Sequence, residues 1–388
     1  MAVLSDLHAT EIAEPRRSWA VEDSDPPLNP LQGLEKLVEE DSQFRADVVL
    51  CPGDLCDQAD WGALPYAWAE VHRFADMLGA EQVIATVGNH DIDSHNKHDG
   101  EELDAGLRRL APGFPCDPGA ESYWTDRVTR VSGEGWQVVS LNSSLMRELA
   151  EQEADRGEVH DQTLELIAAI TRGEEFAVNV LLCHHHPQPF TRAAPGDASH
   201  MEAGDRLVTL LDRLPDTWMI VHGHKHYPHL DYMDGTSASP ARLVAGSAGV
   251  VLWPMLSSYV RNQLHLLEFP VGLCSELDLS LAGQVRSWSW QPGGKWFPAR
   301  ADGDGLPGIA GFGYRIDGPS LARSLFREAR EHEIAVVERE RLQQWNPRLP
   351  FLLPADLAAF RDYLERHLGC HLRLDTLGNV EQVVMPNG

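Results

Sequence analysis

The chain has 388 residues, 43% of them hydrophobic and 23% charged, a composition typical of a globular protein with one large core and a smaller appended domain. Its formal net charge of −27 repels phosphate backbones and anionic lipid, which argues against membrane binding and against a long nucleic-acid footprint. The six cysteines form no C-x-x-C pair, so we expect reduced, buried thiols. No signal peptide or transmembrane run is recognisable, and we expect a cytoplasmic location.

The first part of the chain alternates strands and helices. The expected elements are, in order, a very short strand over 2–4, a Pro-rich loop over 11–30, a helix over 31–38, a strand over 47–51, a helix over 66–78 and a strand over 83–87. Each of these strands runs directly into acidic or histidine residues. The first strand is so short that its place in a sheet could be exposed or covered by another segment.

The stretch Gly88-Asn89-His90-Asp91 leaves the apolar run over 83–87, whose β-branched residues predict a buried strand. Ligands of open α/β sheets bind at the carboxyl ends of the strands, where this stretch lies. It offers an amide oxygen, an imidazole and a carboxylate. Taken alone, it is equally compatible with an ordinary turn.

The middle of the chain continues the alternation after an interruption. Residues 92–135 are rich in Gly, Pro and charge and suggest inserted cap loops, including His95-Asn96-Lys97-His98-Asp99. Beyond them we expect strands over 136–142, 176–183, 218–221, 243–249 and 264–269, with helices over 164–170 and 207–211. The strands over 176–183 and 218–221 run into His184-His185-His186-Pro187 and His222-Gly223-His224-Lys225-His226.

The pattern changes after residue 270. Residues 277–281 and 285–290 alternate as hairpin strands do, and 292–319 are loaded with Gly and Pro, so we expect a β-hairpin and linker over 271–317. Over 318–388 we expect a helical accessory region with a terminal hairpin: a long solvated helix over 320–344, a helix over 355–367 and strands over 372–375 and 380–385. This region is either a cap over apolar surface or a module for oligomerisation or partner docking.

The polar residues at the strand ends form one set of potential ligands. They are Asp6, His8, Asp54, Asn89, His90, His184 or His185, His224 and His226. Carboxylates, imidazoles and an amide oxygen suit borderline divalent metals such as Mn²⁺, Fe²⁺ or Zn²⁺. The set is too large for one tetrahedral zinc ion and would suit two ions that share a bridging carboxylate.

Five motifs in this order resemble those of the calcineurin-like metallophosphoesterase superfamily. They are Asp6-Leu7-His8, Gly53-Asp54 with Asp57, Gly88-Asn89-His90-Asp91, His184-His185-His186-Pro187 and Gly223-His224-Lys225-His226. The resemblance covers about residues 1–270, and the His-His-His-Pro form resembles bacterial cyclic-nucleotide phosphodiesterases and related class III enzymes more than protein phosphatases. It implies a four-layered α/β/β/α sandwich as the catalytic domain, with the C-terminal α+β extension beyond it.

The resemblance also implies roles for individual residues. Asp6, His8 and His226 would hold a first metal ion, and Asn89, His184 and His224 a second, with Asp54 bridging the two. The ions would be Mn²⁺, Fe²⁺/Fe³⁺ or Zn²⁺, with a hydroxide between them as the nucleophile. His90 would protonate the leaving oxygen and Asp91 would orient His90. His185 remains an alternative to His184, and His186, His200, His222 and His229 could line the pocket.

These residues predict a metal-dependent phosphodiesterase for a small or accessible phosphodiester, such as a cyclic nucleotide. A metal-dependent nuclease of the same superfamily is an alternative, with nucleic acid only as a substrate. A third hypothesis is an effector or interaction subunit of a larger complex, or a homo-oligomer, that docks through 318–388.

Overall fold

The computed structural model describes residues 1–11, 29–41, 43–94, 97–144, 155–190, 199–236, 238–249, 260–291, 295–303 and 305–386. The chain divides into two compact units, one of Met1–Leu266 with Trp288–Phe297 and one of Leu267–Ser287 with Pro298–Gly388. The domain boundaries expected from the sequence stay a prediction. Most of the expected loop over 11–30, together with His95 and Asn96, lies outside the described residues. Within the described ranges, no helix combines the length and apolar character needed to cross a membrane.

The first sheet has seven strands in the order β12-β11-β10-β1-β2-β3, with β13 paired to β11. These are β1 (Ala2–Val3), β2 (Val48–Cys51), β3 (Gln82–Ala85), β10 (Gln263–Glu268), β11 (Gly283–Gln291), β12 (Lys295–Pro298) and β13 (Ile309–Phe312). The two-residue β1 is parallel to β2 and antiparallel to β10, and both of its residues are buried. The short first strand is therefore an interior strand of the sheet.

The second sheet has six strands in the order β4-β5-β6-β7-β9-β8. These are β4 (Val128–Gly133), β5 (Trp136–Leu141), β6 (Val178–Leu182), β7 (Met219–His222), β8 (His229–Tyr232) and β9 (Ala241–Val244). The inner strands are parallel, and β4 and β8 pair antiparallel at the edges. The expectation of cap loops over all of 92–135 is wrong in its last part, because β4 forms a hairpin with β5 around Gly135, whose φ of 76° suits a glycine turn.

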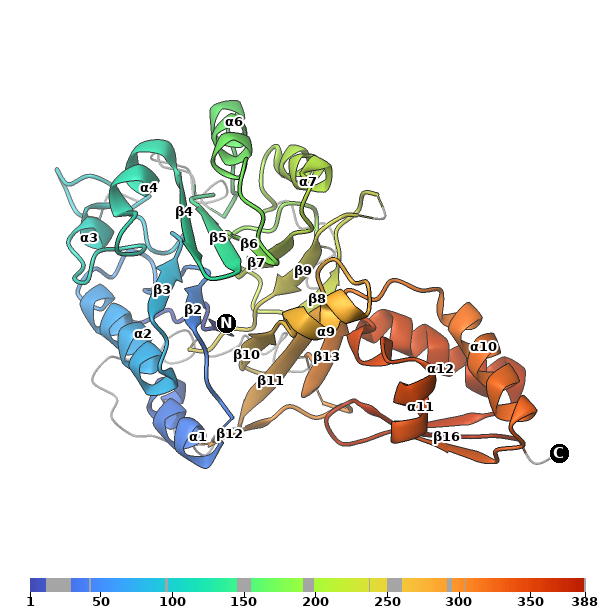
Figure 1. The fold of residues 1–388 in the computed structure, drawn as a ribbon. Helices are drawn as coiled ribbons and strands as arrows, with labels where there is room; N and C mark the ends of the chain where they lie inside the picture. Colours follow the sequence, from blue (N-terminus) through green and yellow to red (C-terminus); the bar gives the residue numbers. More distant parts are fainter. Residues whose placement is uncertain are drawn as a thin grey trace. The chain divides into compact units, whose positions relative to one another are not determined.

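Helices cover the outer face of each sheet (Figure 1). They are η1 (Pro30–Gly33), α1 (Leu34–Glu40), α2 (Leu64–Leu78), α3 (Ala105–Arg108), α4 (Ala120–Asp126), α6 (Asp161–Ile170) and α7 (Gly204–Arg213). One core joins α1 and α2 to the first sheet through Trp68, Phe74 and Val49, and a second core joins α6 and α7 to the second sheet.

The inner faces of the two sheets are in direct contact. Thr86 Oγ1 donates to the Leu141 carbonyl at 2.7 Å, and Ser140 Oγ donates to the Ala85 carbonyl at 2.6 Å. These bonds join the end of β3 to β5, so the layers follow the order helix, sheet, sheet, helix. The predicted α/β/β/α sandwich is confirmed, and it places the carboxyl ends of both sets of parallel strands at one edge.

The C-terminal unit contains helices and a small antiparallel sheet. Its elements are α9 (Val271–Glu276), α10 (Gly318–Glu331), β14 (Val336–Glu338), α11 (Arg339–Trp345), η2 (Leu349–Phe351), α12 (Pro354–Leu368), β15 (His371–Leu374) and β16 (Val380–Val384). The helix expected over 355–367 and the terminal hairpin are confirmed, and β14 adds a third strand to that hairpin. The α+β character expected of this extension is therefore confirmed.

Three expected elements of this region differ from the structure. The long helix over 320–344 breaks where Glu333 adopts a φ of 53°, and β14 and α11 follow the break. Residues 277–281 follow the helix α9 and form no strand, because their alternation reflects a turn. The expected linker over 292–319 contains β12 and β13, which both pair with β11. Each of these two strands has only four residues, which leaves a weak local signal.

Candidate metal centre

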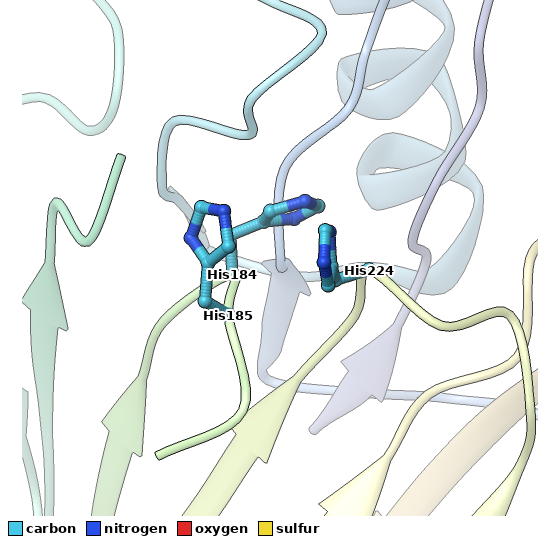
Figure 2. A group of neighbouring side chains, drawn as sticks. All are labelled: His184, His185 and His224. Carbon is cyan, nitrogen blue, oxygen red and sulfur yellow. The ribbon is translucent and has the colours of Figure 1, made fainter. Parts of the chain in front are cut away.

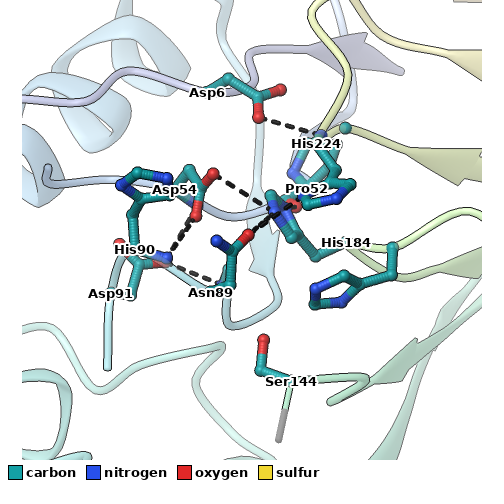
Figure 3. Close-up of polar contacts among 12 residues, drawn as sticks. Asp6, Pro52, Asp54, Asn89, His90, Asp91, Ser144, His184 and His224 are labelled. Carbon is teal, nitrogen blue, oxygen red and sulfur yellow. Dashed lines mark hydrogen bonds and ion pairs between the residues drawn. The ribbon is translucent and has the colours of Figure 1, made fainter. Parts of the chain in front are cut away.

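The predicted ligands meet where parallel strands of both sheets end. Asp6 and His8 follow β1, Asp54 follows β2 and Asn89 follows β3 in the first sheet. From the second sheet, His184 follows β6, and His224 and His226 follow β7. Figure 3 shows Asp54 and Asn89 pointing toward His184 across the gap between the strand ends. The structure thus brings all seven predicted ligands together.

The first cluster consists of Asp6, His8, Asp54 and His226, whose potential ligand atoms all lie within 4.8 Å of one another. The Nε2 atoms of His8 and His226 are 3.1 Å apart. His8 Nε2 lies 3.4 Å from Asp54 Oδ2, and His226 Nε2 lies 3.4 Å from Asp6 Oδ1. Two imidazole nitrogens and two carboxylates that converge in this way fit one divalent cation.

The second cluster is built around the Asn89 side-chain oxygen. Asn89 Oδ1 lies 2.9 Å from His184 Nε2 and 3.0 Å from His224 Nδ1. His184 Nε2 is also 3.2 Å from Asp54 Oδ2, the same oxygen that faces His8 in the first cluster. Asp54 therefore touches both clusters, as a bridging carboxylate must.

His184, His185 and His224 together form a group that could hold a metal ion (Figure 2). Within this group, His184 and His185 have different contacts. His184 Nδ1 lies 2.7 Å from the Pro52 carbonyl, an acceptor that leaves Nε2 facing Asp54 and Asn89. His185 Nδ1 lies 3.0 Å from Ser143 Oγ, and its buried Nε2 has no hydrogen-bond partner among the described residues. His184 is thus the histidine that meets the bridging carboxylate.

The backbone at the strand ends is strained. Most of the predicted ligands have a left-handed φ, which costs an L-residue about 1–2 kcal/mol. They are Asp6 (53°), His8 (48°), Asp54 (54°), His224 (74°) and His226 (51°). Such strain persists only where the surrounding structure enforces it, and here it directs side chains of consecutive strand ends into one space.

Two glycines allow the strand ends to approach this closely. A Cβ at Gly88 would overlap the carboxylate and backbone nitrogen of Asp54. A Cβ at Gly223 would lie 2.5 Å from Asp6 Oδ2. The glycines of the two motifs thus make room for the carboxylates that follow β2 and β1.

The charges of the two clusters depend on each other. Burial raises the pKa of Asp54, but the imidazoles of His184 and His90 outweigh it and hold this pKa well below its usual range. Burial lowers the pKa of His184, but Asp54 opposes this effect and raises the pKa to about 9. The positive charge of protonated imidazole thus compensates the negative charge of the buried carboxylates. Bound divalent cations would compensate this charge equally well. The donor set therefore fits two cations.

His90 lies beside the first cluster, and its partner differs from the one expected. Its Nδ1 is 2.9 Å from Asp57 Oδ1, and its ring is 4.6 Å from that of His8. Burial lowers the pKa of His90, but the carboxylates of Asp54 and Asp57 outweigh it and raise the pKa to about 9. Its side chain is 29% exposed, so a substrate can reach it.

The prediction that Asp91 orients His90 is wrong. The Asp91 carboxylate accepts hydrogen bonds from the backbone nitrogens of Asp54, Cys56 and Gly88 at 2.9–3.1 Å. Burial and the Asp54 charge raise the pKa of Asp91 to about 7. Asp91 therefore holds the loop of Asp54 and faces away from the His90 ring. The residue that contacts the His90 ring, Asp57, lies three positions after Asp54 in the motif that contains both.

Two further contacts orient ligands and have no clear sequence signal. Ser199 Oγ lies 3.0 Å from His224 Nε2, which leaves His224 Nδ1 facing Asn89. Asn89 Nδ2 donates a long hydrogen bond of 3.4 Å to Asp155, so its oxygen faces the histidines. Both partners come from loops, and only the folded chain brings them to the site.

The remaining histidines lie behind or beside the second cluster. His186 and His222 are fully buried, with ring centroids 6.0 Å apart. Burial and the Arg242 charge lower the pKa of His222 to about 3. His200 lines a cavity of about 340 Å³ together with Arg156 and Glu202. Of the histidines singled out as possible pocket residues, His200 is the one that lines this cavity.

Comparisons with known proteins agree with the resemblance seen in the motifs. The model of the calcineurin-like phosphoesterases matches residues 1–228. No curated protein matches the chain.

Solved structures of similar fold include a dimetal phosphatase from Danio rerio, 13% identical, with 74% of this chain and 94% of that chain covered and a TM-score of 0.46. A purple acid phosphatase from yellow lupin (Lupinus luteus) seeds is 12% identical over 76% of this chain, with a TM-score of 0.46; the alignment spans about half of that chain, 52%. A putative 5'-nucleotidase from Staphylococcus aureus is 15% identical, with 99% of this chain and 69% of that chain covered and a TM-score of 0.37.

Proposed function

The chain belongs to the calcineurin-like phosphoesterase family, and from this premise we propose that it is a divalent-metal-dependent phosphodiesterase for a small or accessible phosphodiester such as a cyclic nucleotide. The observation that carries the proposal is the pair of clusters that share Asp54, with His90 beside them. Paired cation sites of this kind suit the in-line displacement of a phosphate ester.

In this proposal each side chain has a definite task. Asp6, His8 and His226 would hold one cation, Asn89, His184 and His224 would hold the other, and Asp54 would bind both. When bound, cations such as Mn²⁺, Fe²⁺ or Zn²⁺ would supply Lewis-acid activation of the phosphate and of the attacking water.

His90 acts on the leaving group in this scheme. A protonated imidazole can donate its proton to the leaving oxygen of the ester, and the Asp57 carboxylate stabilises the charged ring before the transfer. The Nδ1 contact with Asp57 leaves Nε2 as the nitrogen that faces the substrate.

One feature supports a diester over a monoester as the substrate. The His184-His185-His186-Pro187 form resembles that of class III cyclic-nucleotide phosphodiesterases.

The test compares bis(p-nitrophenyl) phosphate with p-nitrophenyl phosphate, and cyclic nucleotides with nucleoside monophosphates, in the presence of Mn²⁺. We expect a higher kcat/KM for each diester, and loss of both activities in Asp54→Asn. Preference for the monoesters would refute the diester assignment, whereas preference for single-stranded DNA or RNA would identify a nuclease instead. If the protein hydrolyses none of these substrates with any of several metals, and metal analysis finds no bound metal, the proposal that it is an enzyme is refuted.

A further inference from the structure

The C-terminal unit contains a cavity of about 290 Å³ that lies outside the residues matched by the family model. All of its lining residues belong to that unit. Its walls come from α11, α12, η2, β13 and the turn between β15 and β16. The volume is close to the lower end of the range of small-molecule sites.

The body of the cavity is apolar and held in place. Leu342, Leu349 and Leu352 are buried and form part of its wall. Gln284 Nε2 donates to the Pro350 carbonyl at 3.3 Å, which ties β11 to η2. A Cβ at Gly311 would collide with the same carbonyl, so β13 and η2 pack backbone against backbone. A cavity that needs no rearrangement loses little binding energy to ordering.

The charge of the lining is opposite to that of the chain. The chain has 59 Asp and Glu against 32 Lys and Arg, yet the lining contains two arginines and no acidic residue. Arg339 is neutralised, because its Nη2 lies 2.7 Å from Asp375 Oδ2 and its Nε donates to the Val380 carbonyl. Arg361 on α12 is exposed and forms no ion pair or hydrogen bond with any of the described residues. The cavity therefore offers one uncompensated guanidinium beside an apolar interior.

We propose that this cavity binds a small apolar monocarboxylate, with its hydrocarbon body among the leucines and its carboxylate on Arg361. A single guanidinium matches a single carboxylate in charge, and the two groups can form paired hydrogen bonds. Such binding is independent of the metal centre and of the reaction proposed for it. The ligand is an amphipathic anion, a class that the acidic remainder of the surface would repel.

The test uses the full chain and isothermal titration calorimetry with octanoate, and with octanol as its neutral counterpart. Octanoate should bind with a Kd of about 1 mM or tighter, and octanol at least about tenfold more weakly. Arg361→Gln should weaken octanoate binding about tenfold and leave octanol binding unchanged, and Arg361→Lys, which keeps the charge but not the paired hydrogen bonds, should restore only part of the affinity. The matched control is Arg366→Gln on the same helix, since Arg366 pairs with Asp362 and does not line the cavity.

A second variant tests the proposal by adding a negative charge beside Arg361 and keeping the arginine. Ala358 is exposed, lines the cavity and precedes Arg361 by three residues on α12, so Ala358→Glu places a carboxylate next to the guanidinium. It should abolish octanoate binding and spare octanol binding. Equal affinities for octanoate and octanol, unchanged octanoate binding in Arg361→Gln, or no binding of either compound would overturn the proposal. Tighter binding of octyl phosphate than of octanoate would overturn the choice of carboxylate.

Discussion

At the scale of single residues, His90 combines exposure to solvent with a carboxylate partner and a position beside the buried ligands. We predict that His90→Ala keeps both cations, because His90 belongs to neither proposed ligand set, and lowers kcat by about 10²–10⁴-fold for alkyl diesters. The effect should be much smaller for p-nitrophenyl leaving groups, which depart without a proton. Metal analysis and kcat for the two substrate types check this prediction. Loss of metal in His90→Ala, or full activity on the alkyl diester, would contradict it.

Asp57 and Asp91 differ in their contacts, and their substitutions should differ in effect. Asp57→Asn weakens the support of the His90 ring and removes a carboxylate 3.5 Å from His8 Nδ1, so it should lower kcat with little change in Tm. Asp91→Asn replaces a carboxylate that accepts three backbone hydrogen bonds, so we expect a drop in Tm and weaker metal binding. This prediction is checked by measuring kcat, metal content and Tm for both variants. A stability loss in Asp57→Asn as large as that in Asp91→Asn would show that the two roles are not separate.

At the scale of elements, the turn after β3 depends on the absence of a side chain at Gly88. Gly88→Ala should displace the Asp54 carboxylate, with which a Cβ would overlap, and so reduce cation binding and activity together. Gly272→Ala in α9 is the control, because a Cβ there meets no atom within 4 Å. Metal content measured on both purified variants tests the prediction, which fails if Gly88→Ala binds two cations per chain.

The β8–β9 pair contains a charge pair whose contribution depends on pH. Arg242 binds Asp231 through Nε at 2.8 Å and Nη2 at 2.6 Å, and Arg242 is buried. Burial raises the pKa of Asp231, but the nearby His229 imidazole and the hydrogen bonds from Arg242 outweigh it and lower the pKa to about 2 from its ordinary value of 3.8. A lowered pKa stabilises the fold by about 2 kcal/mol above pH 4, and this stabilisation is lost as the pH falls toward 2.

Asp231→Asn should therefore lower the free energy of unfolding at pH 6, and the difference from the unmodified protein should shrink between pH 4 and pH 2.5. Urea unfolding of both proteins across this range measures it. Asp362→Asn is a suitable control, since Asp362 pairs with Arg366 at the surface and such pairs contribute little. If the difference in unfolding free energy between Asp231→Asn and the unmodified protein does not change with pH, the stabilisation does not come from the ionised Asp231 carboxylate.

At the scale of the whole molecule, cations that bind only the folded chain must stabilise it. Mn²⁺ at 100 times its Kd should add about 2.7 kcal/mol for each occupied site, seen as a higher Tm than that of the chelator-treated protein. Asp54→Asn removes the shared ligand, so Mn²⁺ should raise the Tm of this variant much less than that of the unmodified protein. An equal increase in that variant would place the bound cations elsewhere.

The sequence by itself determined the fold class and the set of side chains at the strand ends. Ligand types such as Asp6, Asn89 and His224 directly follow apolar runs, and strand ends of parallel sheets converge, so local patterns suffice to predict the sandwich and its site. The tertiary structure alone decided which neighbours these side chains meet. Asp57, and not Asp91, contacts His90, because the Asp91 carboxylate accepts hydrogen bonds from the backbone nitrogens of Asp54, Cys56 and Gly88.

Tertiary contacts also decided the elements that the sequence pattern did not predict. Strands β12 and β13 have four residues each, and their place in the sheet depends on β11, a partner that their own residues do not reveal. The cavity beside Arg361 arises from segments more than 90 residues apart in the chain, Gln284 and Asn379 among them. Periodicity reports which face of an element is buried, whereas the partner of that face depends on the packing of the whole chain.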